Sequence, residues 1–462
     1  EYIDQINVNI LSKEDQSNYY LLGYEISKQL GEKELVISSL AGIVKNVPLG
    51  QQLFSNDYFV ELENLLFGME IDDQVSFIER QASKENIPIG RIGIKLVQNL
   101  YYSGKNLKAK NLLEFLEDSD LADLSRLSTA LQGRAEMAMR HAIEEVPDGV
   151  YHSTLDADGF DEDETHLECT ITVKGSDLKI DYEGTSKQIH RGLNTVINYT
   201  QAYSAYPVKC ALDPYTPRNE GSYRPIDVVA PEGSILNPRY PAPCNARQLT
   251  GHLLAGVIYG ALAQAVPEKI IADSGSAPSM RAVFSGNNPL GNRFTQILFA
   301  SGGMGAAPVK DGLSTTAFPT NAGAGSIEAF ESVAPLIVWK KEFREDSGGA
   351  GTFRGGLGQE CEIEVRSDEP LQLSLLSDRW RHPASGVLGG LHGAHSHIHF
   401  SDGTVPHQKS RTSIGPGMRL HMVYAGGGGY GDPAKRDRTS VRDDVKNGYV
   451  SAKAAKRDYG LS

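Results

Sequence analysis

A change in the character of the chain near residue 110 limits the possible folds more than any other feature. Residues 1–110 contain nine lysines against two arginines, and all 12 histidines and all four cysteines come later. Apolar residues recur at helical spacing in this first part, for example at Leu22, Ile26 and Leu30, which predicts a series of amphipathic helices. We therefore expect an all-helical module over residues 1–110, with a structural or protein-binding role rather than a catalytic one.

The remaining sequence predicts two further parts, a mixed α/β domain over residues 111–345 and a β-rich part with a terminal helix over 346–462. Apolar stripes predict helices over residues 121–145, 200–212 and 246–266, and a solvated helical tail over 441–458. Short alternating or apolar segments predict strands at 167–173, 178–182, 225–229, 336–339, 361–365, 371–375, 396–400 and 418–423. The expected fold class is α+β, with the helical region first.

Composition excludes several classes of function. Acidic residues outnumber basic ones by 58 to 45, a net charge of -13, whereas a nucleic-acid-binding surface requires a basic footprint. The sequence contains no apolar run of membrane-spanning length and starts with a polar segment, so we expect a cytoplasmic protein that does not enter a membrane. The cysteines are scattered without a CxxC pair, which favours neither a zinc finger nor a disulfide framework.

Residues 311–358 concentrate polar groups and glycines beyond what folding alone requires. Glu328 and Glu331 are three residues apart, so on a helix both carboxylates would point to one side. Further along, Asp346 precedes six glycines within residues 348–358, which allow close approach of a ligand or of another strand. We assign Glu331, Glu328 and Asp346 as candidate catalytic residues. The alternative is a solvated helix face followed by hairpin turns and a bulge.

Candidate residues for binding a substrate or a second polypeptide are polar side chains in loops and at helix ends. Asn245 and Arg247 stand at the start of the expected 246–266 helix, where an anion site and a plain helix cap are both possible. The other candidates are Asn219 in a polar turn, Asn321 and Arg354 in the glycine-rich stretch, and the adjacent Asp378 and Arg379.

The sequence contains only weak signals for a metal or phosphate site. His395, His397 and His399 alternate, so on a strand they would share one face and could offer three imidazoles to zinc or manganese; an exposed polar edge strand is the alternative. The acidic run from Asp156 to Glu164 lacks the register of a calcium-binding EF-hand and is interpreted as a solvated loop. The four glycines at 426–429 lack the GK[ST] of a phosphate-binding loop, which favours a tight structural turn.

Three long motifs occur in order along the chain: EGSILNPRYPAPCNAR, DSGGAGTFRGGLG and GGGGYGDPAKRDRTSVRDDVKNGYVSAKAAKRDYGLS. Together they resemble the hydantoinase B/oxoprolinase family over about residues 111–462, whereas the first 110 residues are not recognised. The resemblance implies a B-type subunit, or its C-terminal part, of an ATP-dependent amidohydrolase that opens cyclic amides such as hydantoins or 5-oxoproline. It also implies a hetero-oligomer in which a hydantoinase A-type partner uses ATP to phosphorylate the amide oxygen.

The sequence departs from the family pattern in one important respect. Family members carry Asp- and His-bearing motifs of the kind NDPY…GTHLPD and HHADVGG, to which a divalent metal is attributed, and neither motif occurs here. Two alternatives to the amidohydrolase therefore stay open. One is a subunit of an acetone or acetophenone carboxylase, and the other is a non-catalytic interaction protein that lost the metal site.

Overall fold

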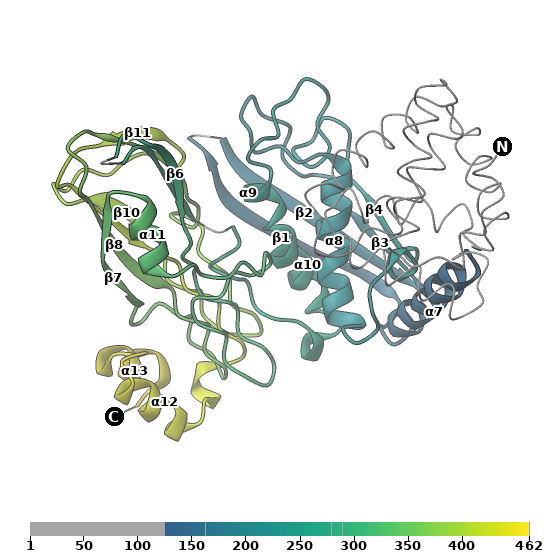
Figure 1. Ribbon diagram of the computed structural model, residues 1–462. Helices are drawn as coiled ribbons and strands as arrows, with labels where there is room; N and C mark the ends of the chain where they lie inside the picture. Colours follow the sequence, from purple (N-terminus) through teal and green to yellow (C-terminus); the bar gives the residue numbers. More distant parts are fainter. Residues whose placement is uncertain (1–124, 162, 279, 289, 462) are drawn as a thin grey trace, which may run out of the picture. The chain divides into compact units, whose positions relative to one another are not determined.

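The computed structural model describes residues 125–161, 163–278, 280–288 and 290–461 (Figure 1). The chain divides into two compact units, residues 1–131 and 132–462. The predicted helical module over residues 1–110 lies outside the residues that the structure describes, which begin at 125. Helices and mostly antiparallel sheets alternate in the second unit, which confirms the α+β class.

A four-stranded sheet forms the first layer of this unit. Its strands follow the order β1 (Gly149–Phe160), β2 (Asp163–Lys174), β3 (Asp177–Asp181) and β4 (Ile226–Val229). Neighbours are antiparallel except for β3 and β4, which run parallel. On β2, alternate residues from Leu167 to Val173 are buried, because successive side chains of a strand point to opposite faces.

Two helices cover the buried face of this sheet, α8 (Ile197–Leu212) and α10 (Leu254–Leu262) (Figure 1). Glycines bring α10 close to β1: a Cβ on Gly260 would lie 2.5 Å from the Ser153 hydroxyl, and one on Gly256 would lie 3.0 Å from Leu155. The apolar side chains of sheet and helices then share one core. The short helix α9 (Gln248–Gly251) precedes α10, and α7 (Ser125–Glu144) contributes Met139 and Ile143 to this core.

The second layer system is a β-sandwich. One sheet has the strand order β10 (His397–Phe400), β12 (Arg419–Val423), β8 (Gln359–Val365) and β7 (Leu336–Phe343). The other has the order β11 (Arg411–Ile414), β9 (Leu371–Leu376), β5 (Arg281–Asn287) and β6 (Arg293–Leu298). Both sheets are antiparallel, and their inward side chains, such as Phe284, Ile363 and Leu373, form one core.

Extended glycine-rich segments pack against one another without forming a regular sheet. A Cβ on Gly355 would lie 1.9 Å from the carbonyl oxygen of Gly427, and one on Gly303 would lie 1.8 Å from that of Gly356. Backbone hydrogen bonds join the segments, for example from Gly427 N to Gly356 O (3.0 Å) and from Gly349 N to Gly427 O (2.9 Å). We call this glycine core the set of segments 272–276, 302–306, 347–358, 384–393 and 424–429.

A pair of helices, α12 (Arg438–Lys446) and α13 (Ala452–Tyr459), ends the described chain. Their small apolar cluster, which includes Val441, Ala455 and Tyr459, also contains Ala350 of the glycine core. Three further short helices are η3 (Glu220–Tyr223), η4 (Pro267–Lys269) and η5 (Pro433–Lys435), and α11 (Ile327–Val333) precedes β7.

Most predicted strands and helices of the second unit are confirmed, but five interpretations are wrong. The 441–458 tail is not one solvated helix but two helices, α12 and α13, which bury Val441 and Tyr459. The boundary at 345/346 does not separate domains, because β7 pairs with β8 across it and β5 and β6 also belong to the sandwich. The acidic run is not a loop, since Asp156 and Asp158 lie on β1 and Asp158 is buried. The 246–266 helix is two helices. Residues 426–429 are not a turn: they extend through the glycine core, where their hydrogen-bond partners are backbone groups from distant parts of the chain.

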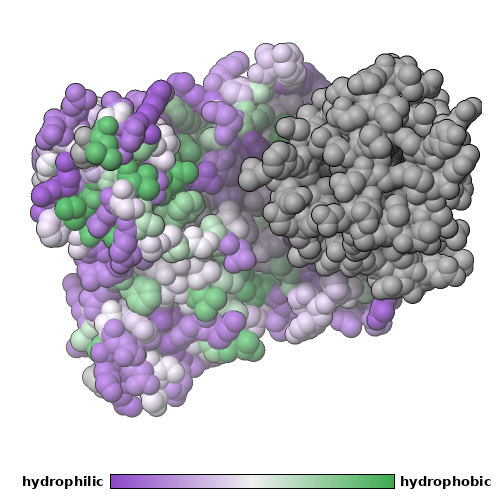
Figure 2. Space-filling model, in the orientation of Figure 1, coloured by the Kyte–Doolittle hydropathy of each residue, from purple (hydrophilic) through white to green (hydrophobic). Residues whose placement is uncertain are grey.

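The surface of the second unit mixes hydrophilic and hydrophobic side chains (Figure 2). Exposed apolar residues include Phe299, after β6, and Val333, at the end of α11. Within the described residues, none of the helices is both long and apolar enough to span a bilayer.

Candidate functional site: a tyrosine cleft beside α8

The candidate residues of the 311–358 stretch do not come together in one site. Glu331, on α11, accepts a hydrogen bond from the backbone N–H of Val338 at 2.7 Å, while Glu328 is exposed in the first turn of the same helix. Asp346 has a positive φ of 57° and accepts a hydrogen bond from Ser451 N at 2.7 Å, next to the start of α13. Asn321 is exposed, with a φ of 52°.

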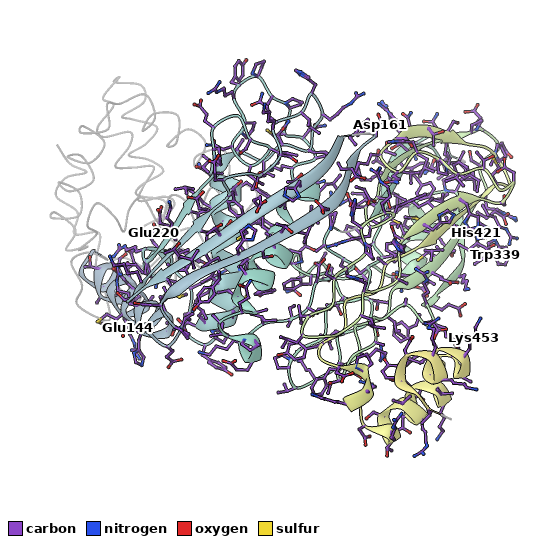
Figure 3. The ribbon with its side chains drawn as sticks, turned by 180° about the vertical axis from the view of Figure 1, so that it is seen from behind. Glu144, Asp161, Glu220, Trp339, His421 and Lys453 are labelled. Atoms are coloured by element: carbon purple, nitrogen blue, oxygen red, sulfur yellow. The ribbon has the colours of Figure 1, made fainter. Side chains whose placement is uncertain are left out.

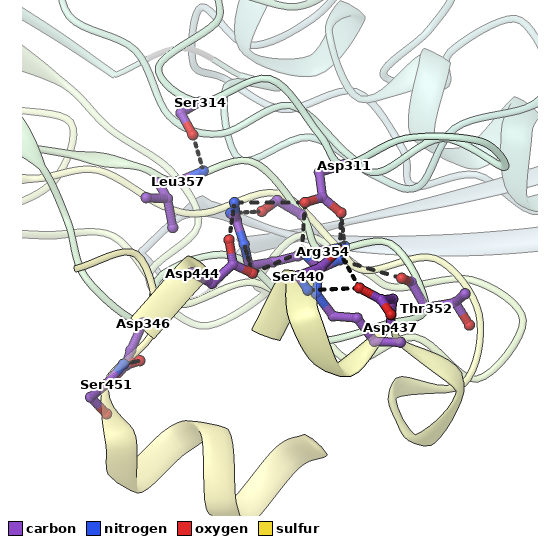
Figure 4. A network of polar contacts seen from close by, with 12 residues as sticks. Asp311, Ser314, Asp346, Thr352, Arg354, Leu357, Asp437, Ser440, Asp444 and Ser451 are labelled. Carbon is purple, nitrogen blue, oxygen red and sulfur yellow. Dashed lines mark hydrogen bonds and ion pairs between the residues drawn. The ribbon is translucent and has the colours of Figure 1, made fainter. Parts of the chain in front are cut away.

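Arg354 lies in a buried ion network rather than on a binding surface (Figure 4). Its Nε donates to Asp444 at 3.2 Å, and its backbone N–H donates to Asp311 at 2.7 Å. Arg436 holds both acids, with hydrogen bonds of 2.6 and 2.7 Å to Asp311 and of 2.8 Å to Asp444. Burial alone would raise the pKa of Asp311, but the hydrogen bonds and positive charges of the arginines keep it below its usual value. The network ties α12 to the glycine core.

Asp378 and Arg379 are likewise buried and paired within the fold. Arg379 forms an ion pair of 2.7 Å with Asp273, and Asp378 forms one of 3.0 Å with Lys409. Nearby, the carboxylate of Asp158 accepts hydrogen bonds from three consecutive backbone N–H groups, at residues 380–382. These contacts join the end of β1 to the sandwich, which is a structural role.

The predicted histidine face is only partly formed. His397 and His399 lie on β10, whereas His395 precedes the strand and its carbonyl accepts a hydrogen bond from Arg344. His399 stacks face to face on His421 of β12, with ring centres 4.7 Å apart. Burial, and then the neighbouring His421 and His397, lowers the pKa of His399. Among the residues that the structure describes, no group of three or more His, Cys, Asp or Glu side chains could hold a metal.

A second row of imidazoles and carboxylates runs along the outer face of β1 and β2. His166 contacts Asp156 through Nδ1 at 2.6 Å and Glu168 through Nε2 at 3.3 Å, and Glu168 also pairs with His152. The hydrogen bond to Asp156 raises the pKa of His166. Because acids and imidazoles alternate along a line, each charge meets its partner within the row, which is typical of a solvated strand face.

A cleft of about 600 Å³ lies between α8, the loop before β4, and β4 itself. Volumes of this order are typical of small-molecule sites. Tyr203 and Tyr206 come from α8, Arg218 and Glu220 from the loop, and Asp227 from β4. The remaining lining residues are Gln201, Ala202, Ala205, Tyr223, Ile226, Val228 and Pro319. We call this the tyrosine cleft.

Helical spacing and stacking hold the tyrosines in place. Tyr199 and Tyr203 are four residues apart on α8, and their rings stack with centres 4.5 Å apart and an interplanar angle of 13°. The guanidinium of Arg247 lies over the Tyr199 ring at 5.4 Å, and the His252 ring stacks on Tyr203 at 5.5 Å. Arg247, Tyr199, Tyr203 and His252 thus form a continuous ladder, of which Tyr203 lines the cleft.

Two tyrosine hydroxyls, that of Tyr206 in the cleft and that of Tyr199 in the ladder, have a raised pKa. Burial, and then the adjacent Cys210, raises the pKa of Tyr206, and burial, and then Tyr203, raises that of Tyr199. No salt bridge of Arg218 occurs within the described residues. The cleft therefore combines flat aromatic walls, neutral donors, one guanidinium and two carboxylates. Such a set suits a small planar ligand with amide groups or an oxygen that carries negative charge.

Of the candidates predicted from the sequence, Asn219 lies next to cleft-lining residues, and Arg247 lies at the end of the ladder away from the cleft-lining Tyr203. Asn219 lies between the lining residues Arg218 and Glu220 and caps η3 by accepting from Gly221 N at 2.9 Å, and Arg247 completes the ladder. Asn245 is exposed, and its side chain occupies the space that a Cβ on Gly192 would fill. The sequence interpretation missed Tyr199, Tyr203 and Tyr206. Tyr203 and Tyr206 lie in the expected 200–212 helix and Tyr199 directly precedes it, and their spacing of four and then three residues could have identified them.

Sequence comparison places this fold among known proteins. The sequence model of the hydantoinase B/oxoprolinase family matches residues 102–433. The chain is 29% identical to the putative B-type subunit of a D-/L-hydantoinase from Pseudomonas sp. (strain NS671), covering 77% of this chain and 62% of that protein. It is 30% identical to the beta chain of the caprolactamase of Pseudomonas jessenii, covering 79% of this chain and 65% of the relative. The chain thus spans less than two-thirds of the length of either relative.

Structural comparison agrees. The crystal structure of the ATP-dependent caprolactamase from Pseudomonas jessenii matches with a TM-score of 0.68 at 26% identity, over 78% of this chain and 66% of that one. A nucleotide-free acetone carboxylase matches with a TM-score of 0.65 over 78% of this chain and 56% of that one; at 18% identity it shows a common fold. On the extent of the family match, this chain belongs to the hydantoinase B/oxoprolinase family.

Proposed function

We propose that this chain is a B-type subunit, or the C-terminal part of one, of an ATP-dependent enzyme that opens the C–N bond of a cyclic amide such as a hydantoin or 5-oxoproline. The names of its relatives support this, since they include a B-type hydantoinase subunit and the beta chain of a caprolactamase. Those names also support a second polypeptide in the complex, for which we propose an A-type ATPase that activates the amide at the expense of ATP.

The observation that carries the proposal is the tyrosine cleft. A cyclic amide is a small flat ring with an N–H donor and a carbonyl acceptor. The protonated hydroxyl of Tyr206 can donate to the carbonyl, the carboxylates of Glu220 and Asp227 can accept from an N–H, and Arg218 can pair with an oxygen that carries negative charge. Because Tyr203 is held in the ladder, its cleft-lining ring is already positioned before a ligand binds.

In this division of labour the described residues bind and orient the ring. The family implies a divalent metal, but the described residues offer no group that fits one. The chain's own part is to hold the ring against the tyrosine wall and to present donors to the amide oxygen.

The test is to reconstitute the chain with its A-type partner, and with any separate polypeptide that supplies the family's N-terminal motifs. Ring opening of hydantoin, 5-oxoproline and caprolactam would then be measured by chromatography, with ADP release in parallel. We expect ATP-dependent opening of at least one of these rings. A complex that opens none of them, but carboxylates a ketone in the presence of bicarbonate, would replace this proposal with the carboxylase.

A matched pair of variants tests the site within that assay. Tyr203→Ala removes a wall of the cleft and should lower kcat/KM by roughly 10- to 100-fold, because a loosely held ring is misaligned for reaction. Tyr215→Ala removes a tyrosine that is 94% exposed, in the loop after α8, and should leave kcat/KM unchanged. Equal effects of the two changes would remove the cleft from the active site.

A further inference from the structure

A second, smaller pocket lies on the outer face of the sandwich, at the start of β5, the end of β6 and the segment of residues 315–324. Its volume is about 130 Å³, and a cavity of roughly 150 Å³ can hold a benzene-sized molecule. Ala282 and Leu298 pair across β5 and β6 and belong to the sandwich core. Because successive side chains of a strand alternate between faces, Arg281, Ile297 and Phe299 lie on the opposite, outer face, and all three line the pocket.

Arg281 brings to this pocket a positive charge that the described residues do not neutralise. The residue is half-buried, and its guanidinium has neither an ion pair nor a hydrogen bond within the part of the chain that the structure describes. Burial, and then the charge of Arg281, lowers the pKa of His252 to about 4, as expected for a ring near an unneutralised cation. A half-buried cation without a partner costs free energy, so the fold alone does not account for it.

The other polar side chains of the pocket can all donate hydrogen bonds. They are the hydroxyls of Ser301, Thr315 and Thr320 and the amide of Gln359. None of the described residues that line the pocket is an Asp or a Glu, although the chain has 58 of these acids. A set of donors without an acid favours an anion over a cation.

We propose that this pocket binds a small organic carboxylate with a short apolar tail, and that Arg281 holds the carboxylate group. A guanidinium presents two parallel N–H groups that match the two oxygens of a carboxylate. Met280, Ile297 and Phe299 supply an apolar wall for the tail, which inorganic phosphate would leave unfilled. The volume suits a ligand of about six non-hydrogen atoms, such as butyrate.

This pocket is distinct from the proposed active site. It shares no described lining residue with the tyrosine cleft, although Pro319 of the cleft and Thr320 of the pocket are adjacent in the sequence. Binding of a carboxylate there goes beyond the proposed function. It can be measured without ATP, a partner chain or a cyclic amide, so its failure and the failure of ring opening are separate results.

The test is a calorimetric titration of the 462-residue chain, at neutral pH and low salt, with butyrate, butyramide and inorganic phosphate. We expect one saturable site for butyrate. Butyramide, its neutral counterpart, should bind more weakly by about tenfold or more, because it cannot form a charged hydrogen-bond pair. Phosphate should also bind more weakly than butyrate. The absence of saturable butyrate binding would overturn the proposal, and tighter binding of phosphate would replace it with a phosphate site.

Two variants test whether butyrate binds in this pocket. Arg281→Gln removes the guanidinium and should weaken butyrate binding by roughly 10- to 100-fold. Phe299→Glu places a carboxylate at the pocket wall and should abolish binding by repulsion. Because Phe299 is 49% exposed, this second variant should fold as the parent does. An unchanged butyrate affinity in either variant would overturn the proposal.

The matched control is Arg293→Gln, at the other end of the β5–β6 pair. Arg293 is exposed, lies opposite Asn287 in the strand register and does not line the pocket. The same loss of charge there should leave the butyrate affinity unchanged. Equal weakening by Arg281→Gln and Arg293→Gln would trace the effect to the overall charge of the chain and overturn the role of Arg281.

Discussion

The glycine core with its ion network and the tyrosine cleft use polar residues in opposite ways. In the first region, Arg354, Arg436, Asp311 and Asp444 neutralise one another, and the glycines approach other backbones so closely that a side chain would not fit. In the cleft, Arg218 has no ion pair within the described residues, and the tyrosines form a wall instead of filling a core. In Figure 3, Glu220 of the cleft lies beside the first sheet, away from the sandwich strand that carries His421.

This difference teaches that a dense run of charge and glycine is not by itself a sign of a functional site. Close packing of backbones requires glycine, and a buried carboxylate requires a cation, so both residue types gather wherever extended segments cross. A binding cleft needs donors and flat walls that the fold leaves unpaired, and these come from ordinary-looking helices and turns.

The largest effect should come from the glycine core. Gly355→Ala would place a Cβ 1.9 Å from the Gly427 carbonyl oxygen, and the backbone on both sides cannot move without breaking hydrogen bonds. We expect a loss of more than about 4 kcal/mol of unfolding free energy, or no folded protein. Gly323→Ala is the control, since nothing lies within 4 Å of its Cβ position. Denaturant unfolding of both variants measures the contrast; similar curves would show that the core tolerates side chains.

The next largest effect should come from the ion network. Asp444→Asn removes the carboxylate that Arg354 and Arg436 share and leaves buried positive charge, at a cost of about 3–5 kcal/mol. The control is Arg239→Gln, which removes an exposed pair with Glu232 worth less than about 1 kcal/mol. Chemical denaturation distinguishes them. If Asp444→Asn cost as little as the control, the network would be a solvated surface feature.

The two regions should also respond to pH in different windows. Protonation of His252 favours the unfolded chain, because its folded pKa of about 4 lies below the unfolded value of about 6.5, so stability should fall as the pH drops through that interval. Asp311 has a lowered pKa, so its contribution is complete above its unfolded pKa of about 3.9 and is lost only at lower pH. Thermal unfolding from pH 8 to 3 should show that His252→Phe removes part of the first decline. If the pH profile of His252→Phe matched that of the unaltered protein, the imidazole of His252 would be able to carry its charge in the folded state.

The smallest effect is expected at Glu331. In Glu331→Gln the amide oxygen can still accept the hydrogen bond from Val338 N, so stability should change by less than about 1 kcal/mol and turnover should not change. Turnover by the reconstituted complex is the deciding measurement. A fall of roughly 10²-fold or more at unchanged Tm would restore Glu331 as a catalytic residue and make the glycine-rich stretch part of the active site.

Sequence patterns located the secondary structure of the second unit better than its organisation. Alternation identified β8, β9, β10 and β12 nearly to the residue, because the period of buried side chains is a local property. The same patterns could not indicate that β5, from the middle of the chain, pairs with β9, or that β7 and β8 belong to one sheet. Pairing depends on which distant segments share a core, and a single sequence does not state this.

The sequence by itself determined the local elements, the absence of a basic footprint, and, through its long motifs, the family. Only the tertiary structure decided which polar residues are free to bind. Arg354 pairs with Asp444, about 90 residues away, and Asp378 pairs with Lys409, about 30 residues away. Arg218 and the nearby tyrosines of α8, in contrast, lie at a cleft. The physical reason is that hydrogen bonds and ion pairs are satisfied in three dimensions, so a residue's availability follows from its neighbours in space and not from its neighbours along the chain.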